Sequence, residues 1–586
     1  MKPGATTLFR ASMTVRAAFA AARISAGSQS RPSRSAAITT APGRPGDPVP
    51  STSVPPAITV SNACTSASWQ DRPRLACGGR WTADGRRRHA QPVLASPTVS
   101  ASHGRTDHPA LSNHPALPDR PPFVLRGRVL TPTHAGATAY HRDGIVEVDA
   151  RGRIAWVGPA ADRTAVRSGA GAIGAVPEID LRPLVLLPGL VDLHAHLPQL
   201  PNAGLGAGLD LLTWLERYVF PLERRFDDAA AAAELAPAAF RTFASVGTTT
   251  VLAYGAVFKA SMEGAFKAAE AHGIRAILGK VMMDRITYDE KIDRSTILDR
   301  SVRESEELCG RWHGADDGRL GYAVTPRFAV SCSAELLAAS AALAARTGAW
   351  WQTHVSEDPG EIAEVGRLFP EALDYVDVYD RAGGLGERTI LAHAVHLSDR
   401  ELRRLVETGT RVAHCPASNL FLASGVMPLS RYLEAGLQVG LGSDVAGGPD
   451  PSIFSVMRVG AYAQNARRTL GGDRHPVLAP LDWIRLGTLD GARALGLGDR
   501  IGSLEAGKEA DIIAVDAGLT APVRHVDLEL QGASRHAPGH AHAGGVYGSA
   551  DDPTELASRL VFRPHPDMVR GAWVRGRRLD GPGYAG

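Results

Sequence analysis

The stretch LVLLPGLVDLHAH, residues 184–196, begins as an apolar run and ends in two histidines, His194 and His196, separated by one residue. A short apolar run without a helical period favours a buried strand. A loop rich in glycine, GLGAG at 204–208, follows the histidines. By themselves the two histidines are compatible with a metal site and with ordinary polar residues where a strand meets a loop.

Runs of this kind occur eight times, and each is followed by a polar loop and an alanine- and leucine-rich helical stretch. Strands that alternate with helices indicate a parallel sheet, and eight such units predict a closed (β/α)8 barrel, the TIM barrel. An open doubly wound sheet is the structural alternative, but its G-x-G-x-x-G loop is not found after the first strand. The runs begin at residues 184, 247, 274, 320, 350, 389, 410 and 437.

Two regions that flank these runs alternate apolar and polar residues and have Gly or Asp at their turns, as in FVLRGRVLTPT (123–133) and MVRGAWVRGRRL (568–579). This alternation predicts short antiparallel strands. We expect the two flanking regions to form one small β-sandwich domain. Residues 121–187 and 505–586 would belong to this domain, and residues 188–504 to the barrel.

The first 120 residues are rich in Ala, Ser, Pro and Arg and contain few acidic residues. Such a segment cannot bury enough apolar surface to fold, so we expect residues 1–120 to be a disordered extension. An Arg- and Ser-rich, acid-poor transit peptide is the alternative interpretation.

The composition of the whole chain, 44% hydrophobic and 21% charged with a formal net charge of +3, gives no indication of a nucleic-acid or membrane partner. The apolar stretches are shorter than the ~20 residues that a membrane-spanning helix needs. The five cysteines are scattered and include no CxxC pair, which argues against a disulfide framework. We therefore expect a cytoplasmic protein.

Polar residues follow several of the predicted barrel strands at their carboxyl ends, where the active sites of such barrels lie. His194 and His196 point to the same side of the first strand because side chains alternate along a strand. The fifth run ends in His354 and the eighth in Asp444. Nitrogen and oxygen ligands without a thiolate suit Zn²⁺, with Fe²⁺ as the close competitor. We predict that these four residues bind one metal ion at a catalytic site.

Glu357 follows His354 by three residues, on the loop that leaves the fifth predicted strand. A bound metal ion lowers the pKa of a water molecule towards ~7, and a nearby carboxylate can accept the proton and pass it to the leaving group. We predict that Glu357 does this; the alternative interpretation is an ordinary surface glutamate. The fourth run contains no lysine that could bridge two metal ions, so one metal ion is favoured.

At this point the motifs carry a family resemblance. With PGLVDLHAH, THVSE, LAHAVHLS, AHCPASN and GLGSDVAGG, in this order between two β regions, the chain resembles the amidohydrolase superfamily. With HLPQ, TPRFAVSC and HVSEDPGEIAEV it is similar to the guanine deaminases over nearly all of residues 122–520. The resemblance implies the hydrolytic deamination of guanine to xanthine and ammonia, with zinc as the cofactor and a homodimeric assembly. The N-terminal extension has no counterpart in the family.

The resemblance also implies roles for individual residues. His393 and Asp444 would orient the attacking hydroxide and Glu357 would shuttle the proton. The zinc ligands implied by the resemblance are those predicted above: His194, His196, His354 and Asp444.

Gln199, Arg327 and Phe328 match the family positions that hold the purine, and His354 lies among them. A fixed arginine fork together with an amide can distinguish the O6 of guanine from an amino group, and buried polar groups used in this way reject analogues that leave them unpaired. Two alternatives stay open at this point. One is the same chemistry on 8-oxoguanine, an s-triazine or an adenosine-like substrate, and the other is a catalytically silent barrel that serves as an assembly protein.

Overall fold

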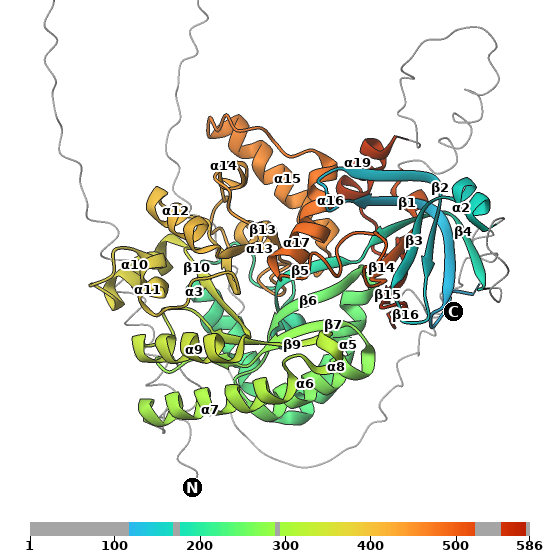
Figure 1. Cartoon of the computed structure of the whole chain (residues 1–586). Coiled ribbons are helices and arrows are strands. Elements are labelled where there is room, and N and C mark those ends of the chain that lie inside the picture. Colours follow the sequence, from blue (N-terminus) through green and yellow to red (C-terminus); the bar gives the residue numbers. More distant parts are fainter. Residues whose placement is uncertain (1–115, 168–175, 287–292, 522–551, 582–586) are drawn as a thin grey trace, which may run out of the picture. The chain divides into compact units, whose positions relative to one another are not determined.

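The computed structural model describes residues 116–167, 176–286, 293–521 and 552–581 (Figure 1). Most of the extension predicted for residues 1–120 lies outside the described residues. Its last residues do contact the rest of the chain: Trp573 Nε1 donates a hydrogen bond to Pro118 O at 2.8 Å. Arg578 forms an ion pair with Asp119 at 2.9 Å.

The predicted TIM barrel is confirmed. Parallel strands follow one another around the sheet in chain order, and helices such as α6, α7 and α9 lie outside them (Figure 1). The barrel strands are β5 (Leu190–His196), β6 (Thr248–Tyr254), β7 (Arg275–Gly279), β9 (Leu320–Pro326), β10 (Trp350–Val355), β11 (Thr389–His393), β12 (Arg411–His414) and β13 (Val439–Leu441), with the short β8 (Val281–Met282) paired to β9.

The barrel is closed between its first and last strands by backbone hydrogen bonds just beyond β13. Asp444 N donates to His194 O at 2.7 Å, and His196 N donates to Val445 O at 2.9 Å. Gly442 permits this close approach, because a Cβ atom there would lie 2.8 Å from the Cβ of His194. Closure therefore brings the eighth strand directly against the histidines of the first.

Capping residues set the ends of several helices around the barrel. Asp or Ser accepts a backbone N–H at the N-terminus of α5, α7, α9, α10 and α12, and glycines with positive φ end α6, α9 and α12. The longer helices are α5 (Ala229–Ser245), α6 (Lys259–His272), α7 (Arg294–Trp312), α9 (Ala334–Thr347), α10 (Pro359–Leu368), α11 (Tyr375–Arg381), α12 (Asp399–Thr408), α15 (Ile453–Leu470) and α19 (Pro553–Phe562).

Short helical segments fill the connections. Those between β5 and α5 are η1 (Leu197–Asn202), α3 (Leu211–Trp214), η2 (Leu215–Val219), α4 (Phe220–Glu223) and η3 (Arg224–Asp227). The others are α2 (Ala160–Arg167), α8 (Ala315–Gly318), α13 (Pro416–Phe421), α14 (Leu429–Glu434), α16 (Pro480–Arg485), η4 (Leu486–Asp490), α17 (Gly491–Ala494) and η5 (Ala517–Thr520).

The β domain is built from both ends of the catalytic region, as expected, and its strands are joined edge to edge because β4 pairs with β1 along one edge and with β14 along the other. The sheet folds over on itself: the ring centroids of Phe123 in β1 and Trp573 in β15 lie 6.2 Å apart although two strands separate β1 from β15, and residues of both halves share one core. The β1–β4 pair is also parallel, where we expected antiparallel strands. In sheet order the strands are β16 (Arg577–Arg578), β15 (Val569–Val574), β14 (Ile512–Val515), β4 (Glu178–Pro188), β1 (Phe123–Pro132), β2 (Thr138–Val148) and β3 (Ile154–Pro159).

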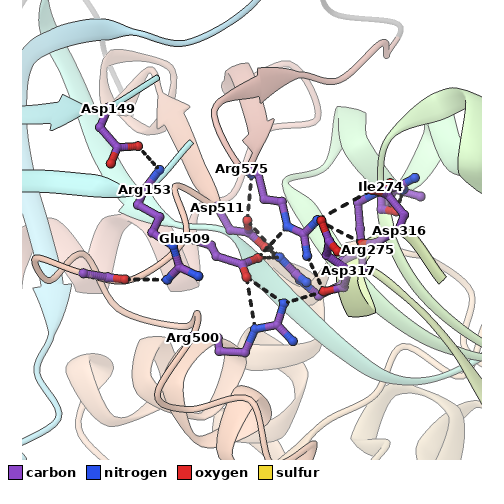
Figure 2. A network of polar contacts seen from close by, with 12 residues as sticks. Asp149, Arg153, Ile274, Arg275, Asp316, Asp317, Arg500, Glu509, Asp511 and Arg575 are labelled. Atoms are coloured by element: carbon purple, nitrogen blue, oxygen red, sulfur yellow. Dashed lines mark hydrogen bonds and ion pairs between the residues drawn. The ribbon is translucent and has the colours of Figure 1, made fainter. Parts of the chain in front are cut away.

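A buried network of charges joins the β domain to the amino end of the barrel (Figure 2). Arg275, the first residue of β7, is fully buried and donates to Asp511 at 3.1 Å and to Glu509 at 2.5 Å. Glu509 also accepts from Arg500 at 2.6 Å and from Arg575 at 2.9 Å. These pairs connect a barrel strand with residues next to β14 and β15 and so fix the domain against the barrel.

In the part of the chain that the structure describes, no helix is long and apolar enough to cross a membrane. Cys309, Cys332 and Cys415 are buried and not in disulfides. Cys64 and Cys77 lie outside the described residues.

Candidate active site

The four predicted metal ligands lie together at the carboxyl end of the barrel. Their ligand atoms are all within 4.8 Å of one another. His194 Nε2 and His196 Nε2 lie 3.1 and 3.2 Å from Asp444 Oδ1, and His354 Nε2 lies 3.3 Å from His196 Nε2. The first, fifth and last barrel strands therefore direct three imidazoles and one carboxylate to one point.

The chemical state of these side chains fits a metal ion. Burial lowers the pKa of His194 to about 4 and, together with the neighbouring histidines, lowers that of His354 well below its ordinary value. Burial raises the pKa of Asp444, but His194 and the other histidines lower it by more. The net pKa is therefore well below the ordinary value. Neutral imidazoles and an ionised carboxylate are the forms that bind metals. His194 Nε2 is buried and makes no hydrogen bond with the described residues, which fits a nitrogen that binds a metal ion.

Neighbouring groups fix the orientation of the histidines. His354 Nδ1 donates to the carbonyl of Arg327 at 2.6 Å, which leaves Nε2 unprotonated towards the cluster. Asp192, buried in β5, accepts from His194 N at 3.1 Å and from Ser443 Oγ at 2.6 Å. Asp192 thus ties the first strand to the segment that carries Asp444.

The backbone is strained at one of the four clustered residues, Asp444, and at its neighbour His393. His393 and Asp444 have φ of 73° and 48°, in the left-handed region that residues other than glycine rarely adopt. Such conformations cost on the order of 1–3 kcal/mol each and persist only where surrounding contacts enforce them. The backbone hydrogen bonds that close the barrel at Asp444 provide such contacts.

Glu357 lies beside the cluster and is only 2% exposed, so it is not an ordinary surface glutamate. Its Oε2 is 3.3 Å from His393 Nε2, and its Oε1 accepts a hydrogen bond from Ser424 at 3.2 Å. Burial, reinforced by the charge of Asp444, raises the pKa of Glu357 well above its ordinary value. A carboxyl group with a raised pKa can both accept and donate a proton near neutral pH.

His393 Nδ1 donates to Asn419 Oδ1 at 2.9 Å, and this bond leaves Nε2 as the nitrogen that faces the site. That nitrogen lies 3.8 Å from Asp444 Oδ2 and, although buried, makes no hydrogen bond with the described residues. In the neutral imidazole it can therefore accept a hydrogen bond from a small molecule held between Glu357 and Asp444.

The residues predicted to hold the purine line the same cavity as three of the four proposed ligands, His196, His354 and Asp444. Gln199 on η1 and Arg327, just after β9, are both buried, and Phe328 is next to them. The apolar wall comes from the loop after β5. The cavity is lined by His196, Gln199, Leu211, Trp214, Leu215, Arg327, Phe328, His354, Glu357, His393, Leu422 and Asp444.

Sequence reasoning missed several polar residues that support the site. Asp192 could have been found, because it alternates with His194 and His196 on one side of a strand. Asn419 is on the short helix α13 and Ser424 in the loop that follows it, where no periodic pattern indicates orientation. Glu223, which contacts the two polar purine-side residues, is on a four-residue helix, which is too short for a periodic pattern to indicate where its side chain points.

A (β/α)8 barrel with three histidines and two carboxyl groups at its carboxyl end defines a metal-dependent hydrolase of the amidohydrolase class. The amidohydrolase family matches residues 185–579. The chain belongs to this family and, within it, to the guanine deaminases.

The similarity to guanine deaminases is seen in sequence and in structure. A probable guanine deaminase of Deinococcus radiodurans is 42% identical over 335 residues, which are 57% of this chain and 74% of the relative. The guanine deaminase of Escherichia coli is 38% identical over 342 residues, which are 58% of this chain and 75% of the relative. A crystal structure of guanine deaminase from C. acetobutylicum with guanine bound in its active site superimposes with a TM-score of 0.67 at 27% identity, covering 78% of this chain and 99% of that one.

Proposed function

We propose that this chain hydrolyses guanine to xanthine and ammonia. One observation carries the proposal: the buried cluster of three histidines and an aspartate opens into the same cavity as the amide of Gln199 and the guanidinium of Arg327. The substrate is a small purine, and the relatives do not favour either the other ring substrates or the silent barrel considered above.

Zinc is the metal that we propose for the site, one ion per chain, with Fe²⁺ as the competitor. Three imidazole nitrogens and one carboxylate oxygen, without a thiolate, are a ligand set that suits either ion. His194, His196, His354 and Asp444 would hold it. A metal ion bound there would act as a Lewis acid and lower the pKa of a water molecule.

Glu357 is the group that moves the proton in this proposal. It accepts the proton of the attacking water on its carboxylate and delivers it to the substrate, so that the 2-amino group leaves as ammonia. The burial that raises its pKa matches its affinity for a proton to this task. His393, fixed through Asn419, orients the nucleophile from a position beside Glu357.

Arg327, Gln199 and Phe328 hold the ring so that its C2 atom faces Glu357. Arg327 offers N–H donors, which suit a ring oxygen or nitrogen acceptor, and Phe328 offers an apolar surface. With these contacts the reacting carbon is positioned before chemistry begins, which is a large part of the rate acceleration in many enzymes.

An ammonia-release assay with guanine, on purified protein of measured metal content, tests the proposal. We expect turnover of guanine by protein that contains one metal ion per chain, loss of activity on chelation, and recovery when Zn²⁺ is added back. Ammonia from another ring together with none from guanine would contradict the proposed substrate. Turnover that is independent of metal content would contradict the proposed site.

We further propose a homodimer in the cytoplasm. The dimer rests on the resemblance to the guanine deaminases. The location rests on the lack of a disulfide pattern among the cysteines. Sedimentation of the purified protein at several concentrations tests the assembly.

A further inference from the structure

Glu223, the last residue of α4, contacts both polar residues of the purine side of the cavity. It is buried, with 3% of its surface exposed. Its Oε1 accepts a hydrogen bond from Gln199 Nε2 at 2.7 Å, and its Oε2 accepts one from Arg327 Nη1 at 2.6 Å. One carboxylate thus links two side chains that come from different loops of the barrel.

This contact decides which way the amide of Gln199 faces. An ionised carboxylate only accepts hydrogen bonds, so the NH₂ group of Gln199 must face Glu223 and its Oε1 must face away. Gln199 lines the cavity, and its Oε1 is buried and has no hydrogen-bond partner in the described chain. Without Glu223 the amide could turn over and exchange its donor for its acceptor.

We infer that Glu223 is a positioning residue that sets the hydrogen-bond polarity of the cavity: it makes Gln199 an acceptor towards the bound ring and holds Arg327, which can only donate, beside it. The inference rests on the proposed function. Guanine presents an N–H donor at N1 beside an oxygen acceptor at C6, which complements this arrangement. 2,6-Diaminopurine has the same 2-amino group, but N1 is an acceptor and C6 bears an amino donor. Glu223 therefore favours the oxopurine over its diamino analogue.

The rival explanation is that Glu223 only stabilises the loop. Arg327 also accepts, through its carbonyl, the hydrogen bond from His354, so a displaced Arg327 would disturb a proposed metal ligand. A loss of that kind would lower the turnover of every substrate equally and would lower the metal content. A change in hydrogen-bond polarity would instead alter the preference between the two purines.

Steady-state kinetics of the full chain with both purines separate these explanations. In Glu223→Gln we expect kcat/KM for guanine to fall about 10- to 100-fold, mainly through KM, because a buried hydrogen bond to a charged group is lost or reversed. We expect the ratio of kcat/KM for guanine to that for 2,6-diaminopurine to fall at least about 10-fold, with metal content unchanged. Glu223→Asp retains a group that only accepts, so it should retain the preference even where its rate falls.

Two further variants complete the design. Glu364→Gln is the matched control, since Glu364 is equally buried and paired with an arginine, Arg367, but does not line the cavity. Its kinetics should equal those of the unmodified protein. Gln199→Met removes the amide and leaves Glu223 in place, so its purine ratio should fall as far as that of Glu223→Gln, whether or not the latter folds well.

An unchanged ratio in Glu223→Gln or in Gln199→Met, in protein that turns over guanine, would overturn the inference and leave the proposed function standing. An equal fall in both purines together with loss of metal would also overturn it, in favour of a structural role. If the unmodified protein does not act on guanine, the proposed function fails and the inference fails with it.

Discussion

The two ends of the barrel both bury charged side chains, but they satisfy them differently. At the amino end, all four carboxylate oxygens of Glu509 and Asp511 accept hydrogen bonds, from Arg275, Arg500 and Arg575 (Figure 2). At the carboxyl end, His194 Nε2, His393 Nε2 and Gln199 Oε1 are buried and make no hydrogen bond with the described residues. Arg275 Nη1 at the amino end is also unpaired in the described chain, so the contrast lies in the carboxylates: those of Glu509 and Asp511 are paired with cations, whereas Glu357 lies beside Asp444 and the unpaired histidine nitrogens of the cavity.

The pairing and the pKa of a buried carboxylate therefore indicate its role. A carboxylate that is paired on every side is expected to contribute to stability and to have no part in chemistry. A carboxylate such as Glu357, held beside another negative charge with its pKa raised, is expected to act in chemistry at some expense of stability. Substitutions at the two ends should therefore have opposite effects on activity and on stability.

The largest effect is expected from Glu357→Gln. Loss of the proton carrier should lower kcat about 10³-fold. The metal content should not change, because Glu357 is not among the four clustered ligands. The melting temperature should stay the same or rise, because the variant removes a buried negative charge next to Asp444. Ammonia release, metal analysis and thermal unfolding measure the three quantities.

Glu364→Gln again serves as the control, with no expected loss of activity. If Glu357→Gln retains more than about a tenth of the normal kcat, Glu357 is not the proton carrier, since general acid–base catalysis typically contributes at least ~10²-fold.

The next effect is on stability, at the other end of the barrel. Arg275→Met leaves Glu509 and Asp511 buried with one cation fewer, and breaking a buried ion pair from one side destabilises a protein by about 3–5 kcal/mol. Activity per folded molecule should be unchanged, because the network lies at the amino end of β7 and the cavity at the carboxyl end. Urea unfolding and kinetics below the unfolding transition measure both.

Arg346→Met is the comparison for that variant. Arg346 pairs with Glu306 on the surface, where about half of each side chain is exposed, and such pairs contribute roughly 0–1 kcal/mol. Equal destabilisation by the two substitutions would show that the buried network has no special role in stability.

The sequence predicted the carboxyl end of the barrel better than the amino end. The proposed ligands and Glu357 follow from one rule, that polar residues at the carboxyl ends of barrel strands converge. No such rule applies to Arg275 at the start of a strand, which is more than two hundred residues from its partners Glu509 and Asp511 in the chain. Glu223 was missed for a similar reason, since Arg327 comes from another loop and Gln199 is 24 residues away.

The β domain shows a second limit of sequence analysis. Alternation of apolar and polar residues predicted its strands, because alternation reflects which face is buried. It does not determine which strand edges pair. The sequence therefore did not predict that β4 pairs with both β1 and β14, or that the β1–β4 pair is parallel.

The smallest effect concerns acid. Burial raises the pKa of Glu509, but Arg275 and the neighbouring arginines lower it by more. The net change is from an ordinary pKa of 4.5 to about 2. A lowered folded-state pKa contributes stability that is fully present above the ordinary value and is lost as the pH falls from about 4.5 to about 2. Glu509→Gln should therefore be less stable than the unmodified protein by on the order of 2 kcal/mol near pH 7, and this difference should shrink on acidification. The pKa of Asp511 is raised by burial and also by the charge of Glu509, so Glu509→Gln relieves part of that upward shift and makes the stability difference near pH 7 smaller than Glu509 alone would give. Protonation of the active-site histidines is common to both proteins, so it cancels in the difference between their urea midpoints.

A difference that stays constant down to low pH would mean that Glu509 stabilises the domain contact through packing and neutral hydrogen bonds. The contrast between the two ends of the barrel would then not be one of charge.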